Sequence, residues 1–168
     1  NYNDLELNAS FKVSPISGPS GIVSINSDNM TRGYNSPYDY QAAFLDENGS
    51  ALKNTEVIFK VNGKEYKVKT NEDGIAQLTG AKLAVGKYNI TSVNPVTNEE
   101  ATNTLEIVKR IIENKDMTVD FDSGKYFKVK VIGDDGNIAP EGEIIDIYVY
   151  KCQLRDCSWF KGTKTTVQ

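Results

Sequence analysis

The chain has 168 residues, a formal net charge of −4 and no histidine. Nucleic acid is not expected as a partner, because phosphate binding needs a clustered basic surface. The absence of histidine removes the most frequent general base and the most frequent zinc ligand. Since no apolar run approaches the roughly 18 residues of a membrane helix, we expect no membrane span in this chain.

Residues 1–21 are predicted to form an N-terminal strand and a linker. Apolar residues alternate with polar ones in this segment, which predicts a half-buried strand. The alternating residues are Leu5, Leu7, Ala9, Phe11 and Val13. The strand resembles the end of a preceding repeat and has no obvious place in the domain that follows. Two hypotheses stay open: the strand fills a groove in another copy of the chain, or the chain is a piece cut from a longer protein.

Residues 22–108 are predicted to form a complete all-β domain. About seven short strands are separated by turn signals, which is typical of a β-sandwich. Asn62-Gly63 is the strongest hairpin signal, because a type I′ turn needs a positive φ at both central positions. The residues predicted to be buried are Tyr40, Phe44, Val57, Phe59, Val61, Tyr88 and Ile90. The residues predicted to be exposed are Lys60, Lys67 and Lys128.

A glycine two residues before a strand-opening tyrosine, in the string from Leu83 to Tyr88, indicates a tyrosine corner. In such a corner the tyrosine hydroxyl bonds back to the backbone of the preceding loop. The alternative is that Tyr88 is an ordinary core residue.

An internal repeat is the most informative feature of the sequence. A shift of 87 residues places Ile25 on Ile112 and the turn glycine Gly49 on Gly136. Beyond that turn the core-facing residues of the two copies align only at a shift that is one residue longer. The same face therefore stays buried only if the loop near Pro140 holds one extra residue. The matched core-facing residues are Val57, Phe59 and Val61 in the first copy and Ile145, Ile147 and Val149 in the second.

Residues 109–168 are therefore predicted to form a second domain, truncated or divergent, with strands at about 111–113, 125–132 and 143–150. Past Val149 the match disappears. Counterparts of the tyrosine-corner strand and of the closing strand are then missing. A sandwich without those strands exposes an apolar groove and unpaired sheet edges.

Four strings in the first domain are similar to known sequences. Thr55–Tyr66, Lys69–Leu78, Gly86–Thr91 and Asn94–Thr97 resemble the Ig-like repeats of adhesin-like surface proteins of methanogenic archaea, which are related to bacterial Ig-like domains. The resemblance covers roughly Ile22–Val149. It implies an all-β fold of immunoglobulin-like β-sandwich repeats in tandem, with the second repeat incomplete. It also implies an extracellular, cell-surface location, and it offers no catalytic motif.

The sequence departs from these repeats after Tyr150, where Cys152 and Cys157 occur. Two cysteines are too few for a structural zinc site. A disulfide that closes a small loop fits an oxidising exterior, and two reduced thiols are the alternative. The aromatic residues of this tail form either a sugar-binding platform or a cover for the core and an edge: Tyr148, Tyr150, Trp159 and Phe160.

Most acidic residues stand in turn signals, which explain them better than acid–base catalysis does. Calcium is the competing interpretation at the domain junction, and its candidate ligands are Asp116, Asp134 and Asp135. An intramolecular Lys–Asn isopeptide bond is a further alternative, although Lys60 and Lys128 alternate onto the polar face. No catalytic residue and no cofactor are expected.

Four N-glycosylation sequons occur, at Asn8, Asn29, Asn48 and Asn89, with chance in an Asn-rich chain as the alternative. Together these features predict a non-enzymatic adhesin or stalk module of the cell surface, for attachment or spacing. Its expected partners are other surface proteins or glycans, and other copies of itself. Two alternative functions stay open: a subunit of an extracellular filament assembled by strand exchange, and a glycan-binding module.

Overall fold

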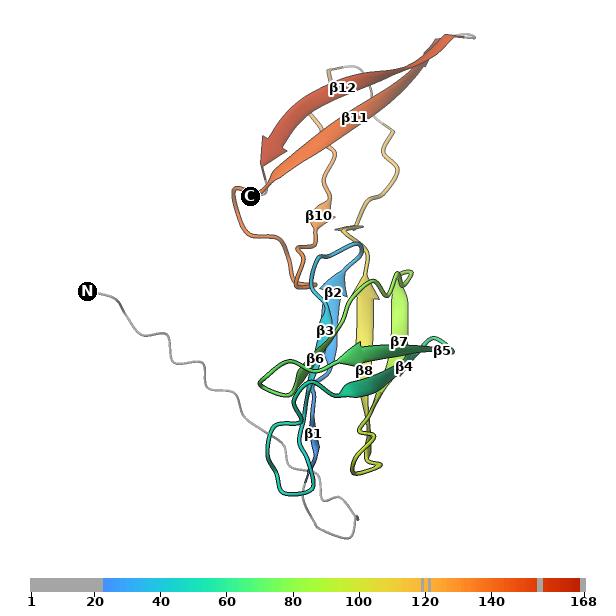
Figure 1. The fold of residues 1–168 in the computed structure, drawn as a ribbon. Helices are drawn as coiled ribbons and strands as arrows, with labels where there is room; N and C mark the ends of the chain where they lie inside the picture. The colour runs from blue at the N-terminus through green and yellow to red at the C-terminus, as the bar shows by residue number, and fades with distance from the viewer. Residues whose placement is uncertain (1–22, 119, 121, 154–155, 167–168) are drawn as a thin grey trace, which may run out of the picture.

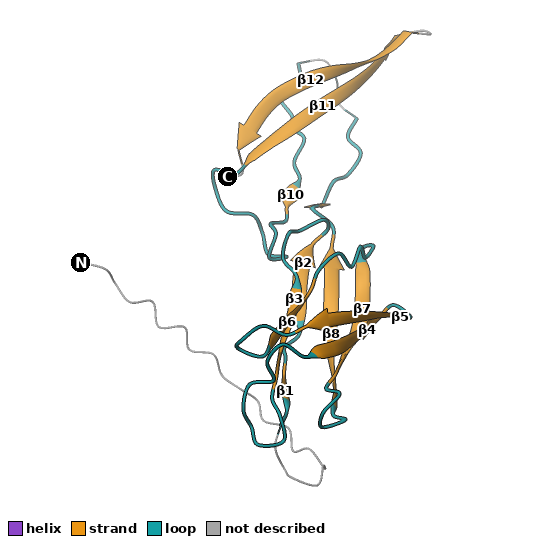
Figure 2. Cartoon of the chain, in the orientation of Figure 1, coloured by secondary structure: helices purple, strands orange, loops and turns teal. Residues whose placement is uncertain are grey.

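The computed structural model describes residues 23–118, 120, 122–153 and 156–166. Throughout these residues the chain forms strands, turns and loops, and no helix (Figure 2). No helix suitable for crossing a membrane is found in the described part of the chain. The residues predicted to form an N-terminal strand, from Leu5 to Val13, lie outside the described residues.

Two sheets build the first segment, which we define as residues 23–108 (Figure 1). The smaller sheet has the strand order β1-β3-β6, and both of its pairings are antiparallel. Its strands are β1 (Ile25–Asn26), β3 (Tyr40–Phe44) and β6 (Ile75–Leu78).

The larger sheet has five strands in the order β2-β8-β7-β4-β5. Its strands are β2 (Met30–Gly33), β4 (Glu56–Val61), β5 (Lys64–Lys69), β7 (Gly86–Val93) and β8 (Glu100–Val108). All its pairings are antiparallel except that of β2 with β8, which is parallel. The chain therefore crosses from the smaller sheet to the larger one between β1 and β2.

A single core lies between the two sheets, in an arrangement consistent with a β-sandwich. At its centre the ring of Phe59, from the larger sheet, meets Tyr40 and Phe44, from the smaller one, edge to face. The predicted buried residues are confirmed, with one exception. Tyr88 is only half-buried, because it stands near the start of β7, at the end of the sandwich.

Turn chemistry sets the connections between the strands of the first segment. Asn62 and Gly63 join β4 to β5 with φ values of 51° and 70°, which confirms the predicted hairpin. Strand β2 was not expected from the sequence. Its four residues, Met-Thr-Arg-Gly, show no apolar alternation, and it is positioned by pairing with β8.

The second segment, residues 109–166, holds two small sheets. Strands β9 (Ile111–Ile112) and β10 (Lys130–Val131) pair antiparallel, and β11 (Ile144–Gln153) and β12 (Asp156–Thr166) form a hairpin. Ile145 and Ile147 alternate with exposed neighbours in the predicted phase, but they are half-buried, whereas their counterparts Val57 and Phe59 are fully buried.

The strand predicted at 125–132 is wrong over most of its length, since only 130–131 is a strand. In the first segment the matching strand β3 is covered by β1 and β6. In the described part of the second segment β10 pairs with β9 alone, and a strand needs a partner for its backbone groups. Phe127, the counterpart of the buried Tyr40, is 52% exposed.

The first strand of the second segment is also shifted by one residue from the predicted match. Ile111 pairs with Val131 as Ile25 pairs with Phe44, so Ile111 rather than Ile112 takes the place of Ile25. The residue that occupies the place of Ser24 is consequently Arg110.

Candidate functional site

The turn that follows β10 repeats the turn that follows β3. In the first segment the amide of Asp46 donates to the carbonyl of Ser50 at 2.8 Å. In the second the amide of Gly133 donates to the carbonyl of Asn137, also at 2.8 Å. Both donors and both acceptors are related by the 87-residue shift found in the sequence.

Isolated bridges flank the two turns in the same way. Leu45 bridges to Ala51 in the first segment, and Ile132 bridges to Ile138 in the second. The shift between them is again 87 residues. The turns therefore match in register, as do the residues just before them, whereas β9 is shifted by one residue from the match with β1.

The turn of the second segment, residues 133–137, lies against strand β2 of the first. The amide of Gly33 donates to the carbonyl of Asp134 at 3.1 Å. A Cβ atom at Gly136 would lie 2.7 Å from Cγ2 of Thr31, and one at Gly33 would lie 2.5 Å from the carbonyl oxygen of Gly133. Both approaches are closer than real Cβ atoms make, so this contact needs both glycines.

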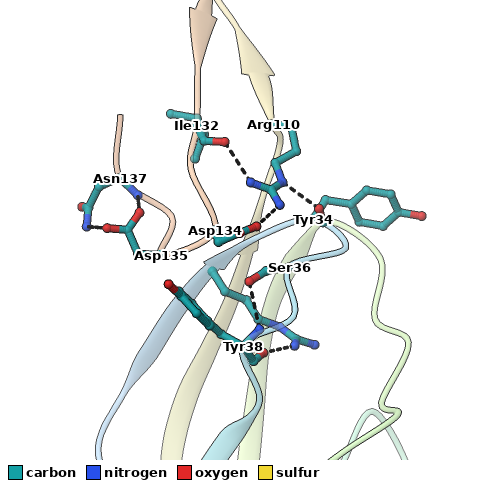
Figure 3. A network of polar contacts seen from close by, with 9 residues as sticks. Tyr34, Ser36, Tyr38, Arg110, Ile132, Asp134, Asp135 and Asn137 are labelled. Atoms are coloured by element: carbon teal, nitrogen blue, oxygen red, sulfur yellow. Dashed lines mark hydrogen bonds and ion pairs between the residues drawn. The ribbon is translucent and has the colours of Figure 1, made fainter. Parts of the chain in front are cut away.

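Arg110 joins the two segments at the same place (Figure 3). Its Nε donates to the carbonyl of Tyr34 in the first segment at 2.9 Å. Its Nη1 donates to the carbonyl of Ile132 at 3.2 Å, and its Nη2 pairs with the carboxylate of Asp134, both in the second segment. The planar guanidinium thus holds three acceptors in fixed directions.

The loop between β2 and β3, whose Tyr34 carbonyl accepts the bond from Arg110, is also held by hydrogen bonds within the first segment. The Ser36 amide donates to the Gly33 carbonyl at 3.0 Å, and Ser36 Oγ accepts the Tyr38 amide at 3.1 Å. Arg32 donates to the carbonyl of Tyr38 and, at 3.3 Å, to that of Ala81. The loop between β2 and β3 is therefore held by bonds that lie entirely within the first segment.

These contacts form the joint, which we define as Thr31, Gly33, Arg110, Asp134 and Gly136. The Arg110–Asp134 ion pair is partly exposed, so it alone contributes no more than about 1 kcal/mol. Steric fit, the Gly33–Asp134 backbone hydrogen bond and the bonds from Arg110 to two backbone carbonyls therefore carry most of the geometry. Such an arrangement fixes the relative orientation of two segments.

Sequence reasoning singled out only part of this joint. Gly136 was identified as a turn glycine and Asp134 as a candidate calcium ligand. Arg110 and Gly33 were not identified, since a lone arginine or glycine carries no motif. The repeat offered the one available signal, because Gly136 occupies the same position as Gly49.

A tyrosine corner is present at the start of β7. The hydroxyl of Tyr88 donates to the carbonyl of Ala84 at 3.1 Å, as predicted. This bond holds the loop before β7 against the end of the sandwich.

The candidate calcium ligands are not brought together as a group. Asp134 pairs with Arg110, and Asp116 is exposed. Asp135 accepts bonds from the side chain and the amide of Asn137, which lower the pKa of its carboxyl. No cluster of three or more metal-ligating side chains is found among the described residues.

Three of the four sequon asparagines lie on the surface. Asn29, Asn48 and Asn89 are exposed, at the crossover, in a turn and on β7 respectively. The side-chain oxygen of Asn29 accepts the amide of Thr104 at 2.7 Å. Asn8 lies outside the described residues.

The two cysteines face one another across the β11–β12 hairpin in backbone register. Cys152 is the Cα partner of Cys157, and Gln153 is that of Asp156. The disulfide between them stays a prediction. Tyr148 is exposed, and the other tail aromatics are placed only by backbone register, with Tyr150 opposite Trp159 and Phe160 opposite Val149.

No protein-family model matches the chain, and no curated protein is detectably similar to it. The joint and the repeated turn are therefore interpreted from their geometry alone.

Proposed function

We propose that this chain is a non-enzymatic module of a cell-surface adhesin or stalk, in which Ig-like units are held in line to space or attach something outside the cell. No catalytic group is part of the proposal. It rests on the strand order of the first segment, on the repeated turn and, above all, on the joint.

The strand order supports an immunoglobulin-like unit. In that family one sheet holds strands A, B and E, and the other holds C, F and G. Here β1-β3-β6 take the places of A, B and E, and β8-β7-β4 take those of G, F and C. The tyrosine corner at the start of β7 is a hallmark of strand F in the same family.

The joint is the observation that carries the proposal. Segments joined by a free linker move independently, and a spacer built from them would have no fixed length. Here the linker between β8 and β9 is only Lys109 and Arg110, and the turn at 133–137 packs against β2. A module whose units keep one orientation is suited to spacing.

Residual dipolar couplings of the full chain test this role. We expect the first segment and residues 130–148 to share one alignment tensor, because the joint fixes their orientation. In Arg110→Ala the couplings of the second segment should shrink while those of the first stay unchanged. Lys109→Ala, one residue earlier and exposed, should leave both sets as in the parent. Independent tensors in the parent chain would contradict the spacer role.

Surface location needs a separate test. Brief protease treatment of intact cells that make the protein should release its peptides, and prior lysis should add little to their yield. Release only after lysis would contradict the cell-surface assignment.

A further inference from the structure

Repeat positions that are buried in the first segment are exposed in the second. Tyr40 is 2% exposed, whereas its counterpart Phe127 is 52% exposed. Met30 is half-buried against the core, whereas Met117 is exposed. The side chains are as apolar in the second segment as in the first, so the difference lies in what covers them.

Exposed apolar side chains are concentrated in the second segment. Seven large ones lie between residues 111 and 148, against six in the longer stretch from 23 to 96. The seven are Ile111, Met117, Tyr126, Phe127, Ile138, Ile144 and Tyr148. The second segment therefore leaves more large apolar side chains uncovered, in fewer residues, than the first.

Strand β11 has one paired edge and one free edge within the described residues. Its counterpart β4 is paired on both sides, with β5 on one edge and β7 on the other. β11 is paired with β12, in the position of β5, and the position of β7 is empty in the described structure. The comparison identifies what covers β11: a strand, antiparallel to it, with an apolar face.

Residues 5–13 have the properties that this position needs. Five apolar residues alternate along nine, a pattern that predicts a strand with one continuous apolar face. Its length is close to the eight residues of β7. Glu6 and Lys12 balance in charge, so the addition buries no net charge.

We propose that residues 5–13 of one copy add as a strand to the free edge of β11 in a second copy, antiparallel, in the position that β7 takes beside β4. Main-chain hydrogen bonds to β11 supply affinity, and the face from Leu5 to Val13 covers the apolar side chains of the second segment. Each copy then donates at one end and accepts at the other. Contacts of this type do not close, so the product is an open head-to-tail polymer.

The geometry of the chain favours pairing of residues 5–13 with β11 of a second copy over pairing with β11 of the same chain. Strand β1 lies at the end of the first segment away from β9 and β10 (Figure 1). From Ile25 to the joint at Gly33 the chain spans at most about 26 Å, and β11 lies beyond the joint. The link from Val13 to Ile25 reaches at most about 40 Å when fully extended. Self-pairing requires this link to run from the β1 end of the first segment past the joint, whereas pairing between copies does not.

Light scattering of the full chain under reducing conditions, over a wide concentration range, tests the exchange. The reductant removes any cross-link through Cys152 or Cys157. We expect the mass to rise with concentration in steps of one chain. The double variant Leu7→Lys/Phe11→Lys places two charges on the apolar face and should stay monomeric. The matched control, Asn8→Lys/Ser10→Lys, charges the opposite face and should polymerise as the parent does.

Hydrogen exchange of β11 locates the contact. Amides of residues 144–149 should exchange more slowly as the parent polymerises, and the Leu7/Phe11 variant should lose this protection. A parent that is monomeric at every concentration overturns the proposal. Polymers that form equally in the Leu7/Phe11 variant also overturn it, because another surface then makes them. A monomer with concentration-independent protection of β11 means self-pairing and overturns the exchange between copies. The outcome is independent of the joint and of surface location.

Discussion

Phe59 lies where the two sheets of the first segment meet, and no part of its side chain reaches solvent. Phe59→Ala should lower the free energy of unfolding by about 3–5 kcal/mol, because it removes a large buried ring and leaves a cavity. Urea denaturation measures this loss. Lys67→Ala, on the exposed edge strand, should change stability by less than about 0.5 kcal/mol. A loss below about 1 kcal/mol for Phe59→Ala would contradict the core assignment.

Tyr40 makes stability depend on alkaline pH. Burial raises the pKa of its hydroxyl above the ordinary 10.0, and the hydroxyl donates to Asn103 Oδ1 at 3.0 Å. Above about pH 10 the unfolded chain releases this proton while the folded chain keeps it, so the free energy of unfolding falls as the pH rises. The contribution is fully present below the unfolded pKa.

Tyr40→Phe tests this dependence. The variant should lose about 1 kcal/mol at neutral pH, the usual net value of one hydrogen bond. Its stability should then fall less steeply than that of the parent as the pH rises above about 10. Denaturation curves over this range give both slopes, and parallel slopes would mean that Tyr40 does not titrate differently in the two states.

Side-chain burial is the property that the sequence predicts best. Alternation assigns Phe59 and Lys60 to opposite faces, because successive residues of a strand point to opposite sides. It does not report how close a residue lies to the end of the sandwich, which is why Tyr88 was expected in the core and is half-buried. Arg110 was beyond prediction, since its partners are carbonyls that only the folded backbone brings together.

At the scale of elements, the β11–β12 hairpin places Cys152 opposite Cys157. In a hairpin of this register the pair next to the loop, Gln153 and Asp156, is expected to be hydrogen-bonded, and the next pair, the two cysteines, is expected to be non-hydrogen-bonded. Such pairs have Cα atoms about 4.5 Å apart, within the range that a disulfide spans.

We therefore predict a disulfide between Cys152 and Cys157. The intact mass without reductant should be about two daltons below the reduced mass, since forming the bond removes two hydrogens. Alkylation without reductant should leave both cysteines unmodified. Two alkylated cysteines in protein kept under air would exclude the bond.

Strands were predictable where their partners are near in sequence. The hairpin at Asn62-Gly63 carries its own turn signal and was predicted. Strand β2 pairs with β8, some 75 residues later, and its sequence carries no trace of that partner. The strand was wrongly predicted at 125–129 for a related reason. The sequence pattern there favours a strand, but it does not show whether a neighbouring strand is present to pair with it.

At the scale of the whole molecule, a comparison of Gly136 with Gly49 distinguishes the contact between the two segments from the conformation of the turn itself. Gly136 and Gly49 have φ values of 80° and 78°, so alanine at either position costs similar backbone strain, about 1–2 kcal/mol. Only at Gly136 does the new methyl group meet another segment, at Thr31, because nothing lies within 4 Å of a Cβ at Gly49.

Gly136→Ala should therefore uncouple the two segments, and Gly49→Ala should not. Residual dipolar couplings should show two alignment tensors in the first variant and one in the second. Equal couplings in both variants would show that the packing of the turn on β2 does not set the orientation.

The parallel pairing of β2 with β8 has a consequence when the chain is pulled. The chain enters the first segment through β1, which has only two pairs, and leaves it through β8. Once β1 has peeled away, tension acts on the start of β2 and the end of β8 in opposite directions. Their four residue pairs, from Met30–Leu105 to Gly33–Val108, are then loaded together in shear. An antiparallel pair pulled at adjacent ends would open one bond at a time, so this strand order resists extension until all four pairs yield at once.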